Sequence, residues 1–337
     1  MPSLLLVLTA ADHWTLSDGS RHPTGFWAEE LLAPLRVFDQ AGVDVTIATP
    51  GGVRPTVDEG SLDPAMIGGE DQAEEMRRGL DAAADRLAAP VRLEDVSASD
   101  YDGVFIPGGH GPMEDLAVSP DMGRLLVMLL DEGKVVASVC HGPAALLPAT
   151  RPDGTWAFAD RRLAGFTNEE EQQAGLADRA PWLLEDRMRE AGGAISGGPA
   201  WEPFSVVDGN VVTGQNPASS AEVAQRTVER LDARSRDDRD GAAHGDGTAD
   251  HEASRERDRR RSRIRVPSSD HEAFAKAVAE AADIDGDAAE RAIEATLVTL
   301  GERISEGEGE DLARHLADSL ARLIVQPGDA QGFGADE

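Results

Sequence analysis

The chain has 337 residues, with 32 Lys plus Arg against 63 Asp plus Glu, for a formal net charge of −31. This length suggests two domains and some connecting sequence. The single cysteine excludes an internal disulfide and any zinc or iron–sulfur site built from several cysteines, and the strong acidity argues against nucleic acid as a partner.

Strand and helix patterns alternate over the first half of the chain. Residues 4–8 form a continuous apolar run, which is typical of a strand buried on both faces. Further strands are expected at residues 43–48, 101–106 and 135–139, and helices at residues 26–41, 71–88 and 121–132, with a short helix ending at Leu147.

The alternation continues with a strand near Leu163, a helix over residues 182–191, a hairpin that turns at residues 208–210, and a helix over residues 217–231. Such alternation predicts an α/β fold with a mostly parallel sheet and helices on both faces. Ligands of these folds bind beyond the carboxyl ends of the strands.

Composition divides the chain into three parts. Residues 1–232 contain every tryptophan and the one tyrosine, and are expected to form the α/β domain. Residues 233–265 have almost no large apolar side chains, which predicts a disordered charged linker that includes the basic run Arg255–Arg265. Residues 266–337 show helical spacing of apolar residues and are expected to form a small all-helical module.

Cys140 is the strongest candidate for a catalytic residue. It follows the apolar strand 135–139 directly, and Pro143 suits the first turn of a helix that begins immediately afterwards. A strand–nucleophile–helix turn of this kind presents a side chain at the end of a sheet. The start of a helix is also expected to lower the pKa of the thiol.

A glycine loop follows the strand 101–106. Gly108 and Gly109 allow the backbone to approach a ligand closely, and their N–H groups are candidates for stabilising a developing oxyanion. His110 follows them directly. The loop therefore predicts a binding site beside Cys140.

The base that would assist Cys140 stays open among several groups. No histidine lies between His141 and the predicted linker, which is where cysteine glutaminases and serine hydrolases of this topology place theirs. The candidates are histidines and carboxylates elsewhere in the domain: His13, His22, His110, His141, Glu29, Glu30, Glu169, Glu170 and Glu171. Acidic residues in a first helical turn most often only stabilise the helix dipole.

Residues 1–232 resemble the ThiJ/PfpI superfamily, whose flavodoxin-like fold is similar to that of class I glutamine amidotransferases. Its glyoxalase III (D-lactate dehydratase) branch of heat-shock chaperones is the most similar. The motifs that carry the resemblance are Ala48–Gly52, Ser61–Pro64, Ile106–Gly111, Val139–Pro143, Gly165–Thr167 and Thr213–Ser220. The resemblance implies a glutathione-independent conversion of methylglyoxal to D-lactate in a stress response, without cofactor or metal.

The resemblance also implies roles for individual residues. Cys140 would be the nucleophile and His141 its adjoining histidine, with Glu30 rather than Glu29 beside the nucleophile. The second glutamate would be Glu171, although Glu170 is close enough to leave that choice open. Oxyanion donors would come from the backbone of Gly109 and His141, and Gly108 and His110 would line the substrate site.

Other activities of the same site stay possible at this point. These are a protein or nucleotide deglycase, an amidohydrolase or protease, and a holdase chaperone in which Cys140 senses oxidants. The superfamily implies a homodimer. The tail from Ser268 to Val325 resembles a repeat of a bacterial and archaeal family of unknown function, and it would have an unknown partner.

Location and solvent are also predicted. No apolar run approaches the ~20 residues needed to cross a bilayer, and the N-terminus lacks the basic segment of a signal peptide. A cytoplasmic protein that binds no membrane is therefore expected. Because only Lys134 and Lys276 are lysines and arginines supply the other basic residues, a halophilic protein adapted to concentrated salt is predicted.

Overall fold

The computed structural model describes residues 1–244 and, beyond them, only Lys276 and Ile293. The chain divides into two compact units, residues 1–244 and 245–337. Helix α9 (Ser220–His244) continues past residue 232, where the sequence places the end of the α/β domain. The rest of the predicted linker, with its basic run, and nearly all of the predicted helical module lie outside the described residues.

A seven-stranded sheet forms the centre of the first unit, in the order β10-β11-β7-β6-β1-β4-β5. All neighbouring strands are parallel except β10 and β11, which form the predicted hairpin. The mostly parallel α/β fold is thus confirmed. The strands are β1 (Ser3–Val7), β4 (Asp44–Thr49), β5 (Val91–Arg92), β6 (Gly103–Ile106), β7 (Val135–Val139), β10 (Ser205–Asp208) and β11 (Val211–Gly214).

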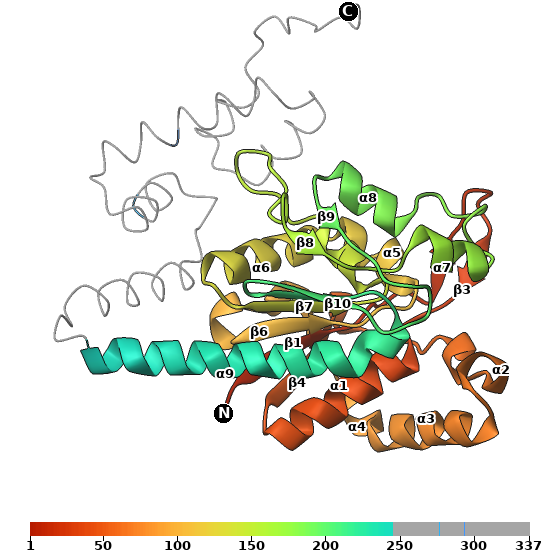
Figure 1. Ribbon diagram of the computed structural model, residues 1–337, viewed down its shortest axis with the longest axis horizontal. Coiled ribbons are helices and arrows are strands. Elements are labelled where there is room, and N and C mark those ends of the chain that lie inside the picture. The colour runs from red at the N-terminus through yellow and green to blue at the C-terminus, as the bar shows by residue number, and fades with distance from the viewer. Residues whose placement is uncertain (245–275, 277–292, 294–337) are drawn as a thin grey trace, which may run out of the picture. The chain divides into compact units, whose positions relative to one another are not determined.

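Helices cover both faces of this sheet. Helices α1 (Ala28–Ala41) and α9 lie on one face, and α6 (Pro120–Asp131) lies on the other (Figure 1). The single helix predicted over residues 71–88 is instead two, α3 (Glu70–Ala82) and α4 (Ala84–Ala88), which meet at Ala83 (φ −88°, ψ −2°). Shorter helices are α2 (Pro64–Ile67), α5 (Gly111–Glu114), α7 (Asn168–Gln173) and α8 (Leu184–Glu190).

The carboxyl ends of β1, β6 and β7 lie side by side at one edge of the sheet. β1, β6 and β7 are neighbours in the sheet, and the side chains of β6 and β7 are buried along their whole length. Phe105 on β6 packs edge-on against Phe38 of α1, with ring centroids 5.4 Å apart. Full burial of each such apolar side chain contributes about 1.5–3 kcal/mol, so the register of these strands is strongly specified.

Two further strand pairs lie outside the main sheet. β2 (His13–Thr15) pairs antiparallel with β3 (Arg21–Pro23), a hairpin that the sequence does not predict. β8 (Arg162–Leu163), at the strand expected near Leu163, pairs with β9 (Ala194–Ile195). Among the described residues, no helix combines the length and apolar character that crossing a membrane requires.

Candidate active site

Cys140 occupies a strained turn at the end of β7. Its φ of +60° is rare for a residue with a side chain, and such a conformation costs about 1–2 kcal/mol. Two backbone hydrogen bonds hold the turn: Cys140 N–H donates to Gly214 O at 3.0 Å, and Phe166 N–H donates to Cys140 O at 2.8 Å. Next to it, Gly142 has no room for a Cβ, which would lie 2.2 Å from Ile106 O. The fold therefore imposes this turn on Cys140.

The Cys140 thiol is buried, with 3% of the residue exposed. Burial, and the neighbouring Glu30 carboxyl, raise the pKa of the thiol well above its usual value, although the backbone N–H groups of Gly109 and His141 act in the opposite direction. The expected lowering by the helix start is therefore outweighed. Because these two amides interact with the sulfur, they lie next to the carbonyl that it would attack and are candidates for stabilising the oxyanion formed there.

His141 connects the thiol to a buried carboxylate. Its Nδ1 lies 3.4 Å from Cys140 Sγ, and its Nε2 lies 2.7 Å from Glu171 Oε2. His141 follows Cys140 directly in the chain, yet its ring turns back onto the sulfur. A histidine placed later in the sequence is therefore not needed for a Cys–His–Glu arrangement.

His110 makes a second contact with the same carboxylate. Its Nε2 lies 2.9 Å from Glu171 Oε1, so Glu171 bridges two imidazoles. The ring centroids of His110 and His141 are 4.1 Å apart, and His110 stacks on Trp14 with a centroid distance of 5.0 Å. His110 was expected to line the substrate site, and the structure places it beside His141.

The electrostatics assign the protons of this network. Burial opposes the ionisation of Glu171, but the neighbouring His141 and the hydrogen bonds from both imidazoles lower the pKa of the carboxyl overall. Burial, followed by the proximity of His110, lowers the pKa of His141. A neutral His141 therefore donates from Nε2 to the ionised Glu171 and leaves Nδ1 as an acceptor toward Cys140.

Glu30 reaches the thiol from the first turn of α1. Ser61 Oγ accepts the Ala28 N–H at 3.1 Å and so replaces the missing side-chain cap of this helix. Gly108 N–H donates to Glu30 Oε2 at 2.6 Å, while Oε1 is buried with no nitrogen or oxygen partner and the carboxyl interacts with Cys140. Burial raises the pKa of Glu30 to about 8, so the carboxyl is mostly protonated at neutral pH.

Gly108 leaves no space at this junction. A Cβ there would lie 2.6 Å from His141 N and 2.9 Å from Glu30 Oε2. Gly109 has a φ of +82°, and a Cβ on it would lie 2.3 Å from Gly25 O. The glycines therefore let the loop pass between α1 and the Cys140 turn, as the sequence suggests.

Glu170 points away from the thiol and serves another purpose. Its Oε2 closes a capping box with Thr167 at the start of α7. Its Oε1 accepts hydrogen bonds from Trp201 N–H, Gln215 Nε2 and Asn216 Nδ2 at 2.8–3.0 Å. Of the two adjacent glutamates, Glu171 is thus the one beside His141. The capping-box spacing of Thr167 and Glu170 is a signal of this division that the sequence contains.

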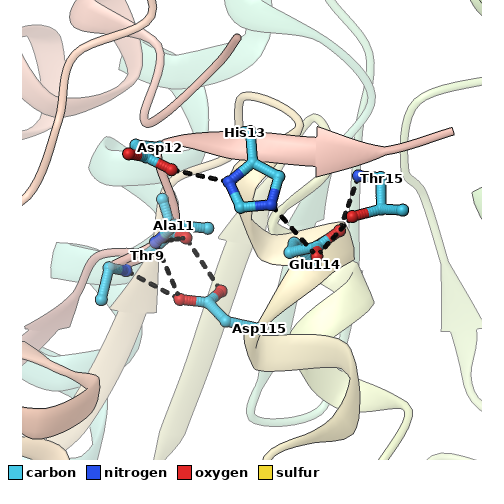
Figure 2. A network of polar contacts seen from close by, with 8 residues as sticks. Thr9, Ala11, Asp12, His13, Thr15, Glu114 and Asp115 are labelled. Atoms are coloured by element: carbon cyan, nitrogen blue, oxygen red, sulfur yellow. Dashed lines mark hydrogen bonds and ion pairs between the residues drawn. The ribbon is translucent and has the colours of Figure 1, made fainter. Parts of the chain in front are cut away.

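Polar contacts attach strand β2 of the β2–β3 hairpin to Glu114 of α5 (Figure 2). Glu114 accepts hydrogen bonds from Thr15 N–H at 2.8 Å and Thr15 Oγ1 at 2.9 Å. His13 lies between Asp12 (2.6 Å) and Glu114 (3.7 Å). The contacts of Thr15 hold its neighbour Trp14, which the sequence did not single out, against His110.

One group among the described residues has the composition of a metal site. His110, His141 and Glu171 offer ligand atoms that all lie within 4.8 Å of one another. The two hydrogen bonds from the imidazoles to Glu171 already account for this arrangement. His13 is not part of this group, because its ring nitrogens contact Asp12 and Glu114.

Comparisons with known proteins find relatives with glyoxalase and deglycase names. Glyoxalase 3 of Candida albicans is 30% identical over 68% of this chain and 98% of its own length. The glutathione-independent glyoxalase HSP31 of Saccharomyces cerevisiae is also 30% identical, over 68% of this chain and 97% of its own. The protein/nucleic acid deglycase HchA of Staphylococcus aureus is 28% identical over 67% of this chain and 79% of its own.

Solved structures show the same fold. The crystal structure of glyoxalase III from Candida albicans matches with a TM-score of 0.60 and 28% identity, covering 68% of this chain and 97% of that one. The rapid encystment protein REP24 of Francisella tularensis matches with a TM-score of 0.61 and 27% identity, covering 68% of this chain and 99% of that one. The match in each case is to the α/β unit.

Family models match two separate parts of the chain. Residues 271–337 match a family described as an uncharacterized conserved protein (DUF2267). Residues 23–172, which contain the Cys140 turn and the carboxylates around it, match the DJ-1/PfpI family. With relatives at 30% identity over nearly their whole length, the chain belongs to the DJ-1/PfpI family.

Proposed function

We propose that the protein is a glutathione-independent glyoxalase that converts methylglyoxal to D-lactate. The observation that carries this proposal is the position of Cys140 between the buried carboxyl of Glu30 and the imidazole of His141, which is held by Glu171. Carbonyl addition followed by proton transfer between carbons needs a nucleophile, an acid–base pair and oxyanion donors. Side chains and amides at this turn can supply all of them.

The first step is addition of sulfur to the aldehyde carbon. The thiol proton passes to His141 Nδ1 as the carbon–sulfur bond forms, and the carbonyl electrons move onto oxygen. The N–H groups of Gly109 and His141 stabilise that oxyanion, and the His141 imidazolium then protonates it to give a neutral hemithioacetal. Glu171 stabilises the imidazolium while it exists.

The second step moves hydrogen from the first carbon to the second. The Glu30 carboxylate removes the proton from the hemithioacetal carbon, giving an enediolate with its negative charge on the former ketone oxygen. Glu30 then returns this proton to the adjacent carbon, while His141 passes the hydroxyl proton of the first carbon to the charged oxygen, which gives a neutral lactoyl thioester and restores the Glu30 carboxylate. A pKa of about 8 suits a group that must both accept and release a proton near neutral pH. Water then hydrolyses the thioester, which releases lactate and restores the thiol.

The relatives support this choice and also a second candidate. Those from Candida albicans and Saccharomyces cerevisiae bear glyoxalase names, and the one from Staphylococcus aureus is named a deglycase. A deglycase would use the same thiol on a hemithioacetal already formed with a protein. The candidates differ in whether free methylglyoxal is the substrate.

A steady-state assay separates these activities. Purified protein in molar KCl is given methylglyoxal, and D-lactate is measured with and without an excess of a cysteine-containing peptide. A glyoxalase turns over free methylglyoxal at a rate that falls as the peptide sequesters it. A rate that depends on the peptide adduct would favour the deglycase. Release of ammonia from amides, without lactate, would favour an amidohydrolase.

The wider setting of the reaction rests on the sequence. We propose a homodimer, as the superfamily resemblance implies, and a cytoplasmic location. The C-terminal module would bind a partner that is still to be identified. Sedimentation of the full chain in molar KCl tests the dimer.

A further inference from the structure

The β2–β3 hairpin brings a second histidine to the active site. Trp14 and His22 are directly paired across the hairpin. Both rings contact His110: Trp14 stacks on it at 5.0 Å, and His22 meets it edge-on at 6.0 Å with an interplanar angle of 86°. The inner face of the hairpin therefore holds His110 between an indole and an imidazole.

His22 differs from Glu171 and His141 in having ring nitrogens that are free to bind substrate. It is only partly buried, and no hydrogen bond to its ring nitrogens is found within residues 1–244. In contrast, both oxygens of Glu171 and both nitrogens of His141 are engaged. Burial and the nearby His110 lower the pKa of His22, so the ring is neutral and carries one N–H donor.

The hairpin is fixed in place from two directions. Glu114 holds Thr15 on one side (Figure 2). On the other side, Arg179 donates to Ser20 Oγ at 2.9 Å, and its carbonyl accepts the Ser17 N–H at 2.8 Å. Arg179 lies in the segment that follows α7, the helix of Glu171. His22 is therefore held at a set position relative to the bridged histidines.

We propose that His22 is a substrate-positioning residue that donates a hydrogen bond to the ketone oxygen of a 2-oxoaldehyde. This inference rests on the proposed function. The amides of Gly109 and His141 take the oxygen of the attacked aldehyde, and the second oxygen needs a donor elsewhere. Cys140, His141 and Glu30 are almost fully buried, whereas His22 is partly exposed and lies against His110, so we assign the second oxygen to His22.

Two substitutions distinguish the effect of the His22 N–H donor from that of its aromatic ring. His22→Phe keeps an aromatic ring against His110 but removes the N–H, and His22→Gln keeps an amide donor without the ring. His13→Phe is the matched control, because His13 lies on the same hairpin and its contacts are with Asp12 and Glu114. His13, Asp12 and Glu114 are all partly exposed to solvent, so the control should fold.

The readouts are kcat/KM for methylglyoxal and the rate at which iodoacetamide, which has no second carbonyl, alkylates Cys140. We expect His22→Phe to lower kcat/KM about tenfold, the usual effect of one lost hydrogen bond to substrate, and to leave alkylation unchanged. His22→Gln should recover to within about threefold of the wild type, and His13→Phe should match the wild type.

Three results would overturn the inference. The first is a normal kcat/KM in His22→Phe. The second is an equal loss in His22→Phe and His22→Gln, because the ring and not the donor would then matter. The third is a parallel fall in alkylation, which would indicate a disturbed site. Failure of the wild type itself to form lactate would contradict the proposed function instead, so the two failures are distinguishable.

Discussion

At the scale of the residue, the pKa of Glu30 has the most direct consequence. The group is fully buried, and burial raises its pKa from 4.5 to about 8. The carboxyl can thus stay neutral in the folded protein at a pH where it ionises in the unfolded chain. Its contribution to stability is complete below pH 4.5 and is lost as pH rises toward 8.

A stability measurement tests this sign. Glu30→Gln replaces a titrating carboxyl by a neutral amide of similar size, so its melting temperature should rise relative to that of the wild type as pH increases from 5 to 8. Above pH 8 the difference should level off. Thermal unfolding of both proteins in molar KCl between pH 5 and 9 checks this, and a constant difference across the range would contradict a raised pKa.

The same carboxyl predicts the pH dependence of catalysis. Because the carboxylate form of Glu30 removes the proton from the hemithioacetal, kcat/KM for methylglyoxal should rise as pH increases toward 8. Glu30→Gln should lose at least a hundredfold in rate at every pH. An activity that falls between pH 6 and 8 would show that the protonated form is the active one.

The adjacent glutamates should respond differently to the same change. Glu171→Gln removes the charge that supports His141, so kcat should fall by about two to four orders of magnitude while the fold persists. Glu170→Gln disturbs a buried hydrogen-bond cluster, so stability should fall by about 1–3 kcal/mol with kcat of the folded fraction nearly unchanged. Kinetics combined with urea unfolding distinguishes the two variants. If Glu170→Gln lost activity and Glu171→Gln lost only stability, Glu170 would be the glutamate that acts with His141.

At the scale of the element, the loop after β6 must pass very close to the Cys140 turn. Gly108→Ala should destabilise the protein by about 1–3 kcal/mol and lower activity, because its Cβ would press on His141 N and Glu30 Oε2. Gly79→Ala is the control: it lies inside α3, and its Cβ meets only the flexible end of Leu32. That change should be neutral or stabilising. Equal effects in urea unfolding would argue against a special role for Gly108.

Elements with a strong local pattern could be predicted from the sequence. The apolar run 135–139 followed by Cys140 and Pro143 predicted both β7 and the turn that presents the thiol. The pairing of Glu171 with His110 could not be predicted, since it joins positions 61 residues apart. The β2–β3 hairpin was missed because each strand has only three residues and follows no clear alternation.

The pKa of the Cys140 thiol could not be predicted from the local sequence. A helix start after Cys140 predicted a lowered pKa, yet the pKa is raised by burial and by Glu30. Burial is a property of the packed domain and has no local signature. The proximity of Glu30 likewise depends on α1 and the β6 loop meeting at one end of the sheet.

At the scale of the whole molecule, the net charge of −31 leads us to propose that the fold is more stable in concentrated salt. Of its two lysines, Lys134 is buried, with its Nζ donating to Ala98 O, so it contributes little to the surface. Repulsion between acidic groups should destabilise the fold in dilute buffer, and salt screens it. The melting temperature should therefore rise steadily from 0.1 M to molar KCl. A flat or falling curve would contradict adaptation to salt.

The central claim is that Cys140 turns methylglyoxal into D-lactate without a cofactor. The most direct test is a stereospecific assay of D-lactate from methylglyoxal in molar KCl, with wild-type protein and Cys140→Ala after extensive dialysis against a chelator and without glutathione. We expect catalytic production of D-lactate by the wild type and none above background by Cys140→Ala. Absence of D-lactate from the folded wild type, or equal production by the variant, would contradict it.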